Sequence, residues 1–181
     1  MNEKINYYDL IKNRRSVRTY DANRKVEDAV LSRILRAGIL APTAKNLQPG
    51  RFILVTDEAK LKEVGQCYGR DWLKDAPAVL IVVGNKKKAW VREDGFNSLQ
   101  IDLTIMLDHM ILAAEYEGVA TCWIAKFDDK MLKKVLNIDE DDFICCITPL
   151  GYPPVGYEKK QVAERKSFKD MVEVIGNNIL G

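Results

Sequence analysis

The chain has 181 residues, 47% of them hydrophobic, with 28 Lys and Arg, 26 Asp and Glu, and a formal net charge of +2 at pH 7. That much apolar material suffices for one core, so we expect a single domain over residues 1–181. The near-neutral charge argues against a nucleic-acid partner, and with no apolar run of roughly 20 residues and no signal-peptide core we expect a cytoplasmic protein without a membrane partner.

Hydrophobic periodicity predicts helices and strands mixed along the first half of the chain. Helices are expected over residues 7–14 and 27–40, and Pro42 stops the second. A short strand over residues 52–55 precedes a helix that Asp57 caps and that runs to residue 66. Residues 78–84 form a continuous β-branched run, which predicts a strand buried on both faces.

The longest predicted helix covers residues 93–117 and is apolar on two sides. One stripe comprises Leu99, Leu103, Met106, Leu107, Met110, Ile111 and Ala114, and the second comprises Ile101, Ile105, Leu112 and Tyr116. Such a helix needs two partners. We expect one side to pack on the sheet and the other on the same helix of a second subunit, in a two-fold homodimer. The alternative is a helix enclosed within one protomer, for which a short chain leaves little material.

The second half predicts a strand over residues 119–124 after Gly118, a helix over 128–136 and a strand over 143–148. A short helix and an apolar extension follow Ser167, with Val172, Val174, Ile175, Ile179 and Leu180. So short a tail is expected to pack on another surface, such as that of the partner subunit. Because the elements lack a regular βαβ alternation, we expect an α+β layered domain.

The four cysteines and the single histidine do not have metal-ligand spacing, so no metal site is expected. All four cysteines are expected to be reduced, and the adjacent Cys145 and Cys146 should point to opposite faces of their strand. His109 is interpreted as a core or interface histidine with Asp102 as its partner.

Two segments contain the candidate functional residues. They are Arg14-Arg15-Ser16-Val17-Arg18 and the nine residues Ala41-Pro42-Thr43-Ala44-Lys45-Asn46-Leu47-Gln48-Pro49. Guanidinium groups pair with phosphate oxygens through forked, charge-assisted hydrogen bonds. Taken alone, the arginine run equally fits a solvated helix end, where cations meet the negative end of the helix dipole.

Four segments in this order resemble the nitroreductase family of FMN-dependent NAD(P)H oxidoreductases. They are the two segments above, Gly118-Val119-Ala120-Thr121-Cys122-Trp123-Ile124, and Leu150-Gly151-Tyr152-Pro153 followed by Arg165-Lys166. The resemblance covers nearly the whole chain, and the Ala-Pro-Thr…Asn-x-Gln-Pro segment is its most specific part. It implies a three-layer α/β/α sandwich, an intertwined homodimer and two FMN sites at the dimer interface. NADH or NADPH would reduce the flavin by ping-pong hydride transfer, and a nitroaromatic, quinone or similar small molecule would accept the electrons.

The resemblance also implies roles for individual residues. Arg14 would hold the FMN phosphate with Arg15 and Ser16 nearby, and Arg165 and Lys166 would close it, although the last two equally fit an ordinary surface pair. Arg18 would lie near N1 and O2 of the flavin ring and stabilise the negative charge of its reduced form; alternatively it only helps to hold the phosphate.

The remaining implied contacts are to the flavin ring. Asn46 and Gln48 of the partner would contact the ring, with Pro42, Thr43 and Ala44 along its edge, although the two amides also suit a role in satisfying the loop backbone. The segment of Thr121, Trp123, Ile124, Ala125 and Lys126 would run along the ring, and Trp123 alone is more typical of a core residue.

The chain departs from the family pattern at two places. Gly50 stands where many relatives have Trp, which removes a large apolar wall, and Ala125-Lys126 stands where glycine is frequent. We find no general base, and hydride transfer at a flavin needs none. Tyr68, Arg70 and Trp72 are candidates for the substrate mouth. The alternatives are an FMN-binding or redox-sensing module with little turnover, or a divergent member with specialised flavin chemistry.

Overall fold

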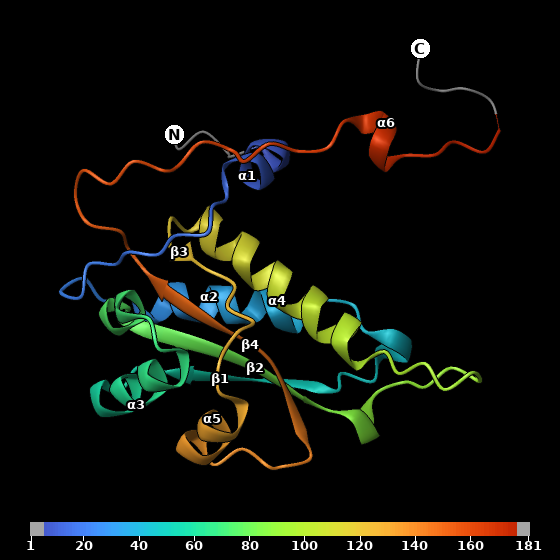
Figure 1. Ribbon diagram of the computed structural model, residues 1–181, viewed down its shortest axis with the longest axis horizontal. Coiled ribbons are helices and arrows are strands. Elements are labelled where there is room, and N and C mark those ends of the chain that lie inside the picture. The colour runs from blue at the N-terminus through green and yellow to red at the C-terminus, as the bar shows by residue number, and fades with distance from the viewer. Residues whose placement is uncertain (1–5, 177–181) are drawn as a thin grey trace.

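The computed structural model describes residues 6–176 and arranges them as a four-stranded sheet between two layers of helices (Figure 1). The strands are β1 (Gly50–Val55), β2 (Ala78–Asn85), β3 (Ala120–Thr121) and β4 (Asp142–Gly151), in the spatial order β1-β2-β4-β3. All three neighbouring pairs are antiparallel. The α+β three-layer sandwich predicted from the sequence is therefore confirmed.

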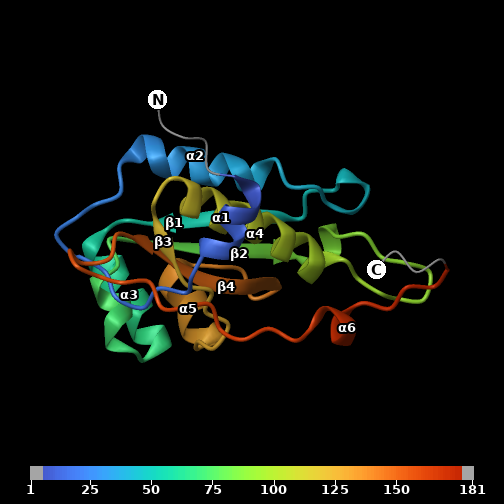
Figure 2. The same cartoon turned by 90° about the horizontal axis from the view of Figure 1, so that it is seen from above.

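The helices divide between the two faces of the sheet (Figures 1 and 2). Helices α2 (Asp28–Ile39) and α4 (Leu99–Tyr116) cover one face, and α3 (Glu58–Tyr68) and α5 (Asp129–Leu136) cover the other. Helix α1 (Tyr7–Asn13) lies beside the C-terminal half of α4, and α6 (Phe168–Met171) lies in the C-terminal segment.

A hydrophobic core lies on each face of the sheet, and side chains of the central strand β2 pack into both, as its continuous apolar run predicts. Leu80 and Val82 pack in the core beneath α2 and α4, while Ile81 and Val83 pack in the core beneath α3 and α5. The predicted cap is present, since Asp57 accepts a hydrogen bond from the Lys60 N–H at 2.9 Å, and Asp128 caps α5 in the same way by accepting one from the Met131 N–H at 2.9 Å. These bonds satisfy helix N–H groups that have no partner within the helix.

Two predictions about elements are wrong. The long helix begins at Leu99 and not at residue 93, because residues 91–97 form a tight turn with a left-handed Gly95 and a hydrogen bond from the Arg92 N–H to the Phe96 carbonyl. Likewise, the segment after Gly118 forms a strand only at Ala120–Thr121, followed by a single bridge between Ile124 and Ile147.

Cys145 and Cys146 do not point to opposite faces as predicted. The register of β4 against β2 shifts between Val82 and Val83, so that Cys145 is the extra residue of a β-bulge. Both cysteines consequently pack against the core beneath α4. All four cysteines are free, which confirms that prediction.

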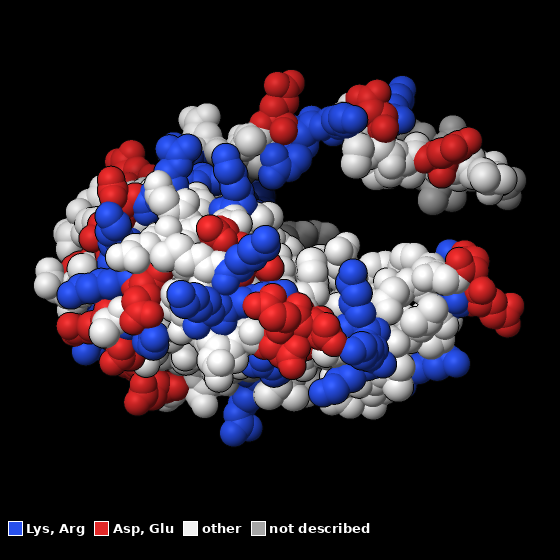
Figure 3. Space-filling view, turned by 60° about the horizontal axis from the view of Figure 1, so that its bottom comes forward, with Lys and Arg blue, Asp and Glu red and all other residues white. Residues whose placement is uncertain are grey.

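Helix α4 retains the second apolar stripe on its outer surface. Ile101 and Tyr116 are 52% and 54% exposed, and Ile105 and Leu112 are half-buried. The C-terminal segment is also uncovered, with Val162, Phe168, Met171 and Ile175 exposed as it projects away from the body (Figure 3). Ile179 and Leu180 of the predicted tail lie outside the described residues. None of the helices in residues 6–176 has the length and apolar character to cross a bilayer.

Candidate functional site

The arginine run lies along the outer edge of strand β3. The Val17 N–H donates to the Thr121 carbonyl at 2.9 Å, and Ser16 and Thr121 form a parallel bridge. Val17 is itself buried, and the Tyr20 hydroxyl donates to its carbonyl at 2.9 Å. The sequence fixes this path because Val17 and Tyr20 are apolar anchors between exposed or half-buried polar residues.

Because Ser16 pairs with Thr121, the arginine run passes beside Cys122, the residue that follows β3. Burial raises the pKa of the Cys122 thiol, while Arg18, Ser16 and Arg14 each act to lower it. The structure thus brings together three of the predicted phosphate and flavin residues at one edge of the sheet. Burial also raises the pKa of the neighbouring Tyr20, beside Cys122 and Tyr157, which keeps its hydroxyl a neutral donor.

The arginine side chains of this edge have no carboxylate partner in the part of the chain that the structure describes. Among residues 6–176, no Asp or Glu oxygen lies within 4.0 Å of a guanidinium nitrogen of Arg14, Arg15 or Arg18. Arg15 instead donates to the carbonyls of Lys12, Arg14 and Lys160, so it fastens the C-terminal segment beside α1. Arg14 and Arg18 keep donors available for an anionic ligand.

The same edge offers backbone donors beyond the arginine run. Alternate residues of an extended segment direct their N–H groups to opposite sides. The Ile124 N–H turns inward and donates to the Ile147 carbonyl at 3.0 Å. The N–H groups of Trp123 and Ala125 therefore face outward, and neither has a hydrogen-bond partner in the described part of the chain. Trp123 is 37% exposed, so its interpretation as a core residue is wrong.

The proline-marked segment lies at the other end of α4. The Ala44 N–H donates to Asp102 Oδ1 at 2.9 Å, near the start of α4, while the arginine run meets β3 beyond its C-terminus (Figure 1). At about 1.5 Å per residue, α4 spans roughly 21 Å from Asp102 to Tyr116. One chain therefore does not bring Asn46 and Gln48 to the arginine run.

The loop itself is tightly turned. Lys45, Asn46 and Gln48 have φ of 50°, 56° and 49°, in the left-handed region. The Gln48 N–H donates to Thr43 Oγ1 at 3.1 Å, and the Gln48 side-chain amide donates to the Asn46 carbonyl at 3.2 Å. Pro42 is exposed, and so are the Asn46 and Gln48 side chains. This loop thus projects a ridge of polar groups from the body of the molecule.

Sequence reasoning missed the residue that anchors this loop. Asp102 was expected to pair with His109, but its two oxygens accept hydrogen bonds from the Ala44 N–H and the Ser98 hydroxyl. The interpretation as a histidine partner is therefore wrong. The i, i+4 spacing of Ser98 and Asp102 was the signal in the sequence, although nothing in it pointed to Ala44.

The other predicted residues make contacts of their own. The Arg165 guanidinium, in the C-terminal segment, donates to the carbonyls of Ala163 and Glu164, and Lys166 is exposed nearby. Tyr68 and Trp72 stack edge-to-face with centroids 5.4 Å apart, and Trp72 also contacts Tyr20 at 6.2 Å. Within residues 6–176 no cluster of three or more His, Cys, Asp or Glu could hold a metal.

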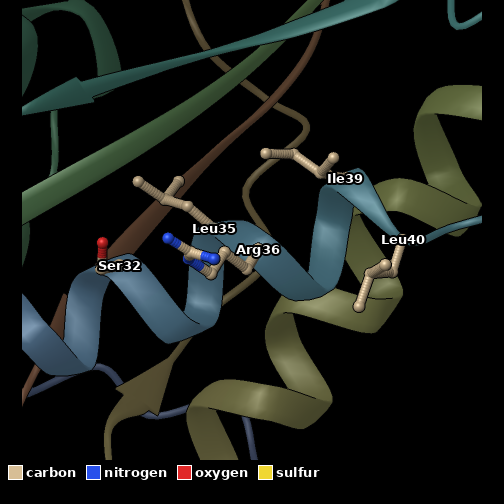
Figure 4. A pocket seen from close by; sticks show the side chains of 5 residues that line it. All are labelled: Ser32, Leu35, Arg36, Ile39 and Leu40. Atoms are coloured by element: carbon tan, nitrogen blue, oxygen red, sulfur yellow. The ribbon is translucent and has the colours of Figure 1, made fainter.

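Two hollows lie on the α2 side of the molecule. One, of about 490 Å³, follows the outer surface of α2 and is lined by Ser32, Leu35, Arg36, Ile39 and Leu40 (Figure 4). The other, of about 180 Å³, includes Thr43, Gln48 and Gly50. The second hollow connects the proline-marked loop with α4 through Met106.

The layered fold is an α+β sandwich, and its β3 edge carries backbone and guanidinium donors that have no partner among residues 6–176. The family model described as nitroreductase family matches residues 11–67 and 63–152. The chain belongs to the nitroreductase family.

Individual relatives agree with this assignment. A protein of Archaeoglobus fulgidus, provisionally named an NADH dehydrogenase/NAD(P)H nitroreductase, is 30% identical over 149 residues, which cover 80% of this chain and 83% of the relative. A nitroreductase family protein of Clostridium difficile 630 superposes with a TM-score of 0.80 at 30% identity, covering 93% of this chain and 98% of the other. An FMN-dependent nitroreductase of Clostridium difficile R20291 gives 0.77 at 29% identity, with the same two coverages.

Proposed function

We propose that this protein is an FMN-dependent oxidoreductase that passes electrons from NADH or NADPH to a small-molecule acceptor such as a nitroaromatic or a quinone. Membership of the nitroreductase family and a relative named as FMN-dependent support this proposal. The observation that carries it is the edge at β3, where one short segment paired with Thr121 carries Arg14, Ser16 and Arg18, and no carboxylate of residues 6–176 lies within 4.0 Å of either guanidinium.

The donors at this edge fit the acceptors of FMN. The phosphate of FMN brings nearly two negative charges, which suit Arg14 and the Ser16 hydroxyl, with Arg15 behind them. The flavin ring carries acceptor atoms along one edge, which suit the outward N–H groups of Trp123 and Ala125. Bound FMN would accept a hydride from NAD(P)H and pass the electrons to the acceptor.

Arg18 has a separate role in this proposal. Reduction of a flavin places negative charge at N1 and O2, and a fixed cation beside them favours that charge. Arg18 is exposed and lies two residues beyond Ser16, on the same segment as the phosphate residues. The chain thus provides a cation for each end of the cofactor.

The second half of each site would come from a partner subunit. The Asn46–Gln48 loop is about the length of α4 away from its own arginine run, so a second copy must supply the loop that lines the flavin. We therefore propose a two-fold homodimer of single-domain subunits, with Pro42, Thr43, Ala44, Asn46 and Gln48 of one subunit facing Arg14–Arg18 of the other. The exposed outer stripe of α4 and the projecting C-terminal segment supply apolar surface for that contact.

The C-terminal segment would complete the phosphate site in the assembled dimer. Lys159 pairs with Glu115 and Arg15 binds the Lys160 carbonyl, so this segment starts beside the arginine run. Arg165 and Lys166 follow five residues later and are proposed to reach the phosphate once the segment is packed on a neighbouring surface.

The visible spectrum of the purified protein tests the cofactor. We expect flavin absorption bands, and denaturation should release FMN in a ratio of about one per chain, as two equivalent sites require. Anaerobic mixing with NADH and NADPH in turn should bleach those bands with at least one of the two. A colourless protein that also fails to bind added FMN would contradict the proposal. A bound flavin that neither nucleotide bleaches would support a binding module instead.

A further inference from the structure

Asp102 is a buried carboxylate at the start of α4. It is 2% exposed, and it is the one Asp or Glu among residues 6–176 that is fully buried. A buried charge needs partners, because burial without hydrogen bonds costs several kcal/mol. Asp102 has two, the Ala44 N–H at 2.9 Å and the Ser98 hydroxyl at 2.8 Å. Its place in the first turn of α4 adds a favourable interaction with the helix dipole.

Ser98 serves this carboxylate instead of capping its own helix. Ser98 occupies the N-cap position of α4, where a serine hydroxyl normally accepts from a backbone N–H of the first turn. Here the side chain makes no such bond and donates to Asp102 Oδ2. Ser98 is 4% exposed, and its own N–H donates to the Trp90 carbonyl at 2.9 Å. The hydroxyl therefore fixes the orientation of the carboxylate.

The hydrogen bond from the Ala44 N–H lies at the start of the strained Ala44–Gln48 loop. Ala44 immediately precedes Lys45 and Asn46, two residues in the left-handed region, and Gln48 is a third. Each costs of order 1 kcal/mol for a residue with a side chain, and such backbone persists only where the surroundings hold it. Among residues 6–176, Asp102 provides the one side-chain hydrogen bond to this loop from outside it, since the Thr43 and Gln48 bonds lie within the proline-marked segment; the other outside contact is Lys45 Nζ, 5.9 Å from the centre of the Trp90 ring.

We infer that Asp102, held by Ser98, is a positioning residue for the FMN site of the partner subunit. It fixes the backbone of the Ala44–Gln48 loop, and that loop lines the flavin bound by the other chain. This inference depends on the proposed FMN-binding dimer, and it adds that a carboxylate roughly 21 Å along α4 from its own arginine run controls FMN affinity in trans.

Substitution of Asp102 tests the anchor. Asp102→Ala leaves the Ala44 N–H without its acceptor, and we expect the Kd for FMN to rise at least about tenfold, equivalent to about 1.4 kcal/mol. Asp102→Asn should stay within about threefold of the wild type, because Oδ1 still accepts from Ala44 and the amide can donate to the Ser98 oxygen. Flavin fluorescence titration of the dimer measures both.

A matched variant separates positioning from general loss of stability. Asp57→Ala removes the N-cap of α3, and α3 packs on the face of the sheet opposite to α2 and α4. This substitution should lower the free energy of unfolding by about 1 kcal/mol and leave the Kd for FMN unchanged. Should Asp102→Ala fail to fold, Ser98→Ala removes only the hydroxyl that orients Asp102 and should still weaken FMN binding more than Asp57→Ala does.

Mixed dimers test the action in trans. A dimer of one Asp102→Ala chain and one Arg14→Ala chain contains one site with an intact arginine run and an intact loop, and one site with both damaged. We expect such dimers, purified through two different tags, to bind FMN at half the wild-type stoichiometry, whereas each homodimeric variant binds weakly at both sites. When Asp102→Ala does not fold, Ser98→Ala replaces it in the mixed dimer.

Failure of the inference about Asp102 can be distinguished from failure of the proposed function. Wild-type protein that binds no FMN contradicts the proposed function itself. Wild-type protein that binds FMN, together with an unchanged Kd in Asp102→Ala, overturns the inference about Asp102. Mixed dimers that recover no site also overturn it, because Asp102 would then act on its own chain.

Discussion

At the scale of single residues, three guanidiniums of one short run have different environments. The Arg15 guanidinium donates to the backbone carbonyls of Lys12, Arg14 and Lys160, and the last of these bonds holds the C-terminal segment beside α1. Arg14 and Arg18 act on the Cys122 thiol, and no carboxylate among the described residues pairs with them. Composition alone does not distinguish these roles, because the backbone path of the run decides them.

The first prediction concerns the charge of Arg18. In Arg18→Ala with FMN bound, the flavin midpoint potential should fall by roughly 30–60 mV, since the reduced form loses a stabilising cation. Spectroelectrochemical titration measures it. Arg24→Ala is the control, because Arg24 is an exposed cation stacked 3.7 Å over the Tyr152 ring. Equal potentials in wild type and Arg18→Ala would leave only a phosphate role for Arg18.

The second prediction concerns Gly50, the departure from the family pattern. A Cβ at this position would lie 2.4 Å from Leu103 Cδ2 and 3.0 Å from Met106 Sδ, so α4 occupies the space of a side chain. Gly50→Ala should therefore lower the free energy of unfolding by about 1–3 kcal/mol. Gly65→Ala, inside α3 with its nearest contact at 3.4 Å, should instead raise it by about 0.5–1 kcal/mol. Urea denaturation compares the two, and a neutral Gly50→Ala would mean that α4 shifts freely.

At the scale of elements, α4 connects the two candidate half-sites. Its first turn anchors the proline-marked loop through Asp102, and Gly118 ends it where β3 meets the arginine run. Near that end, Arg33 of α2 binds Glu117 through two hydrogen bonds of 2.7 and 2.8 Å. This pair holds α2 against the C-terminus of α4.

The third prediction uses the pH dependence of this pair. The hydrogen bonds from Arg33 lower the pKa of Glu117 below its usual value of 4.5. A carboxyl with a lowered pKa in the folded state adds stability above its unfolded pKa and loses it as the pH falls through the folded value. Glu117→Gln should therefore be less stable than wild type at pH 7, and the difference should disappear well below pH 4.5. Urea titrations at several pH values measure this, and a difference that persists in acid would mean that Gln disturbs packing.

At the scale of the whole molecule, large apolar side chains remain exposed on the single chain. Ile101 and Tyr116 of the outer stripe of α4 remain exposed, and so do Phe168, Met171 and Ile175 of the C-terminal segment. That segment projects from the body of the molecule (Figure 3). Exposed apolar side chains on two elements of one chain favour the proposed interface between two copies. The separation of the arginine run from the Asn46–Gln48 loop is an independent observation that supports the proposed dimer.

The fourth prediction concerns that interface. Ile101→Glu places a charge in the exposed stripe of α4, and we expect it to convert dimers to monomers and to lose bound FMN together with them. Gln66→Glu, on the exposed surface of α3, should leave both unchanged. Light scattering after size-exclusion chromatography gives the mass. A dimeric Ile101→Glu would place the interface elsewhere on the chain, and a monomeric variant that keeps its FMN would overturn the shared site.

The sequence by itself determined most of the helices and strands, the cap at Asp57 and the layered class, because periodicity and capping are local properties of the chain. It also predicted the motif residues, through their resemblance to a family. Only the tertiary structure decided that Cys145 bulges out of register, that Asp102 holds Ala44 and not His109, and that Gly50 leaves room for Leu103. These depend on contacts between residues far apart in the chain, where packing in three dimensions overrides local pattern.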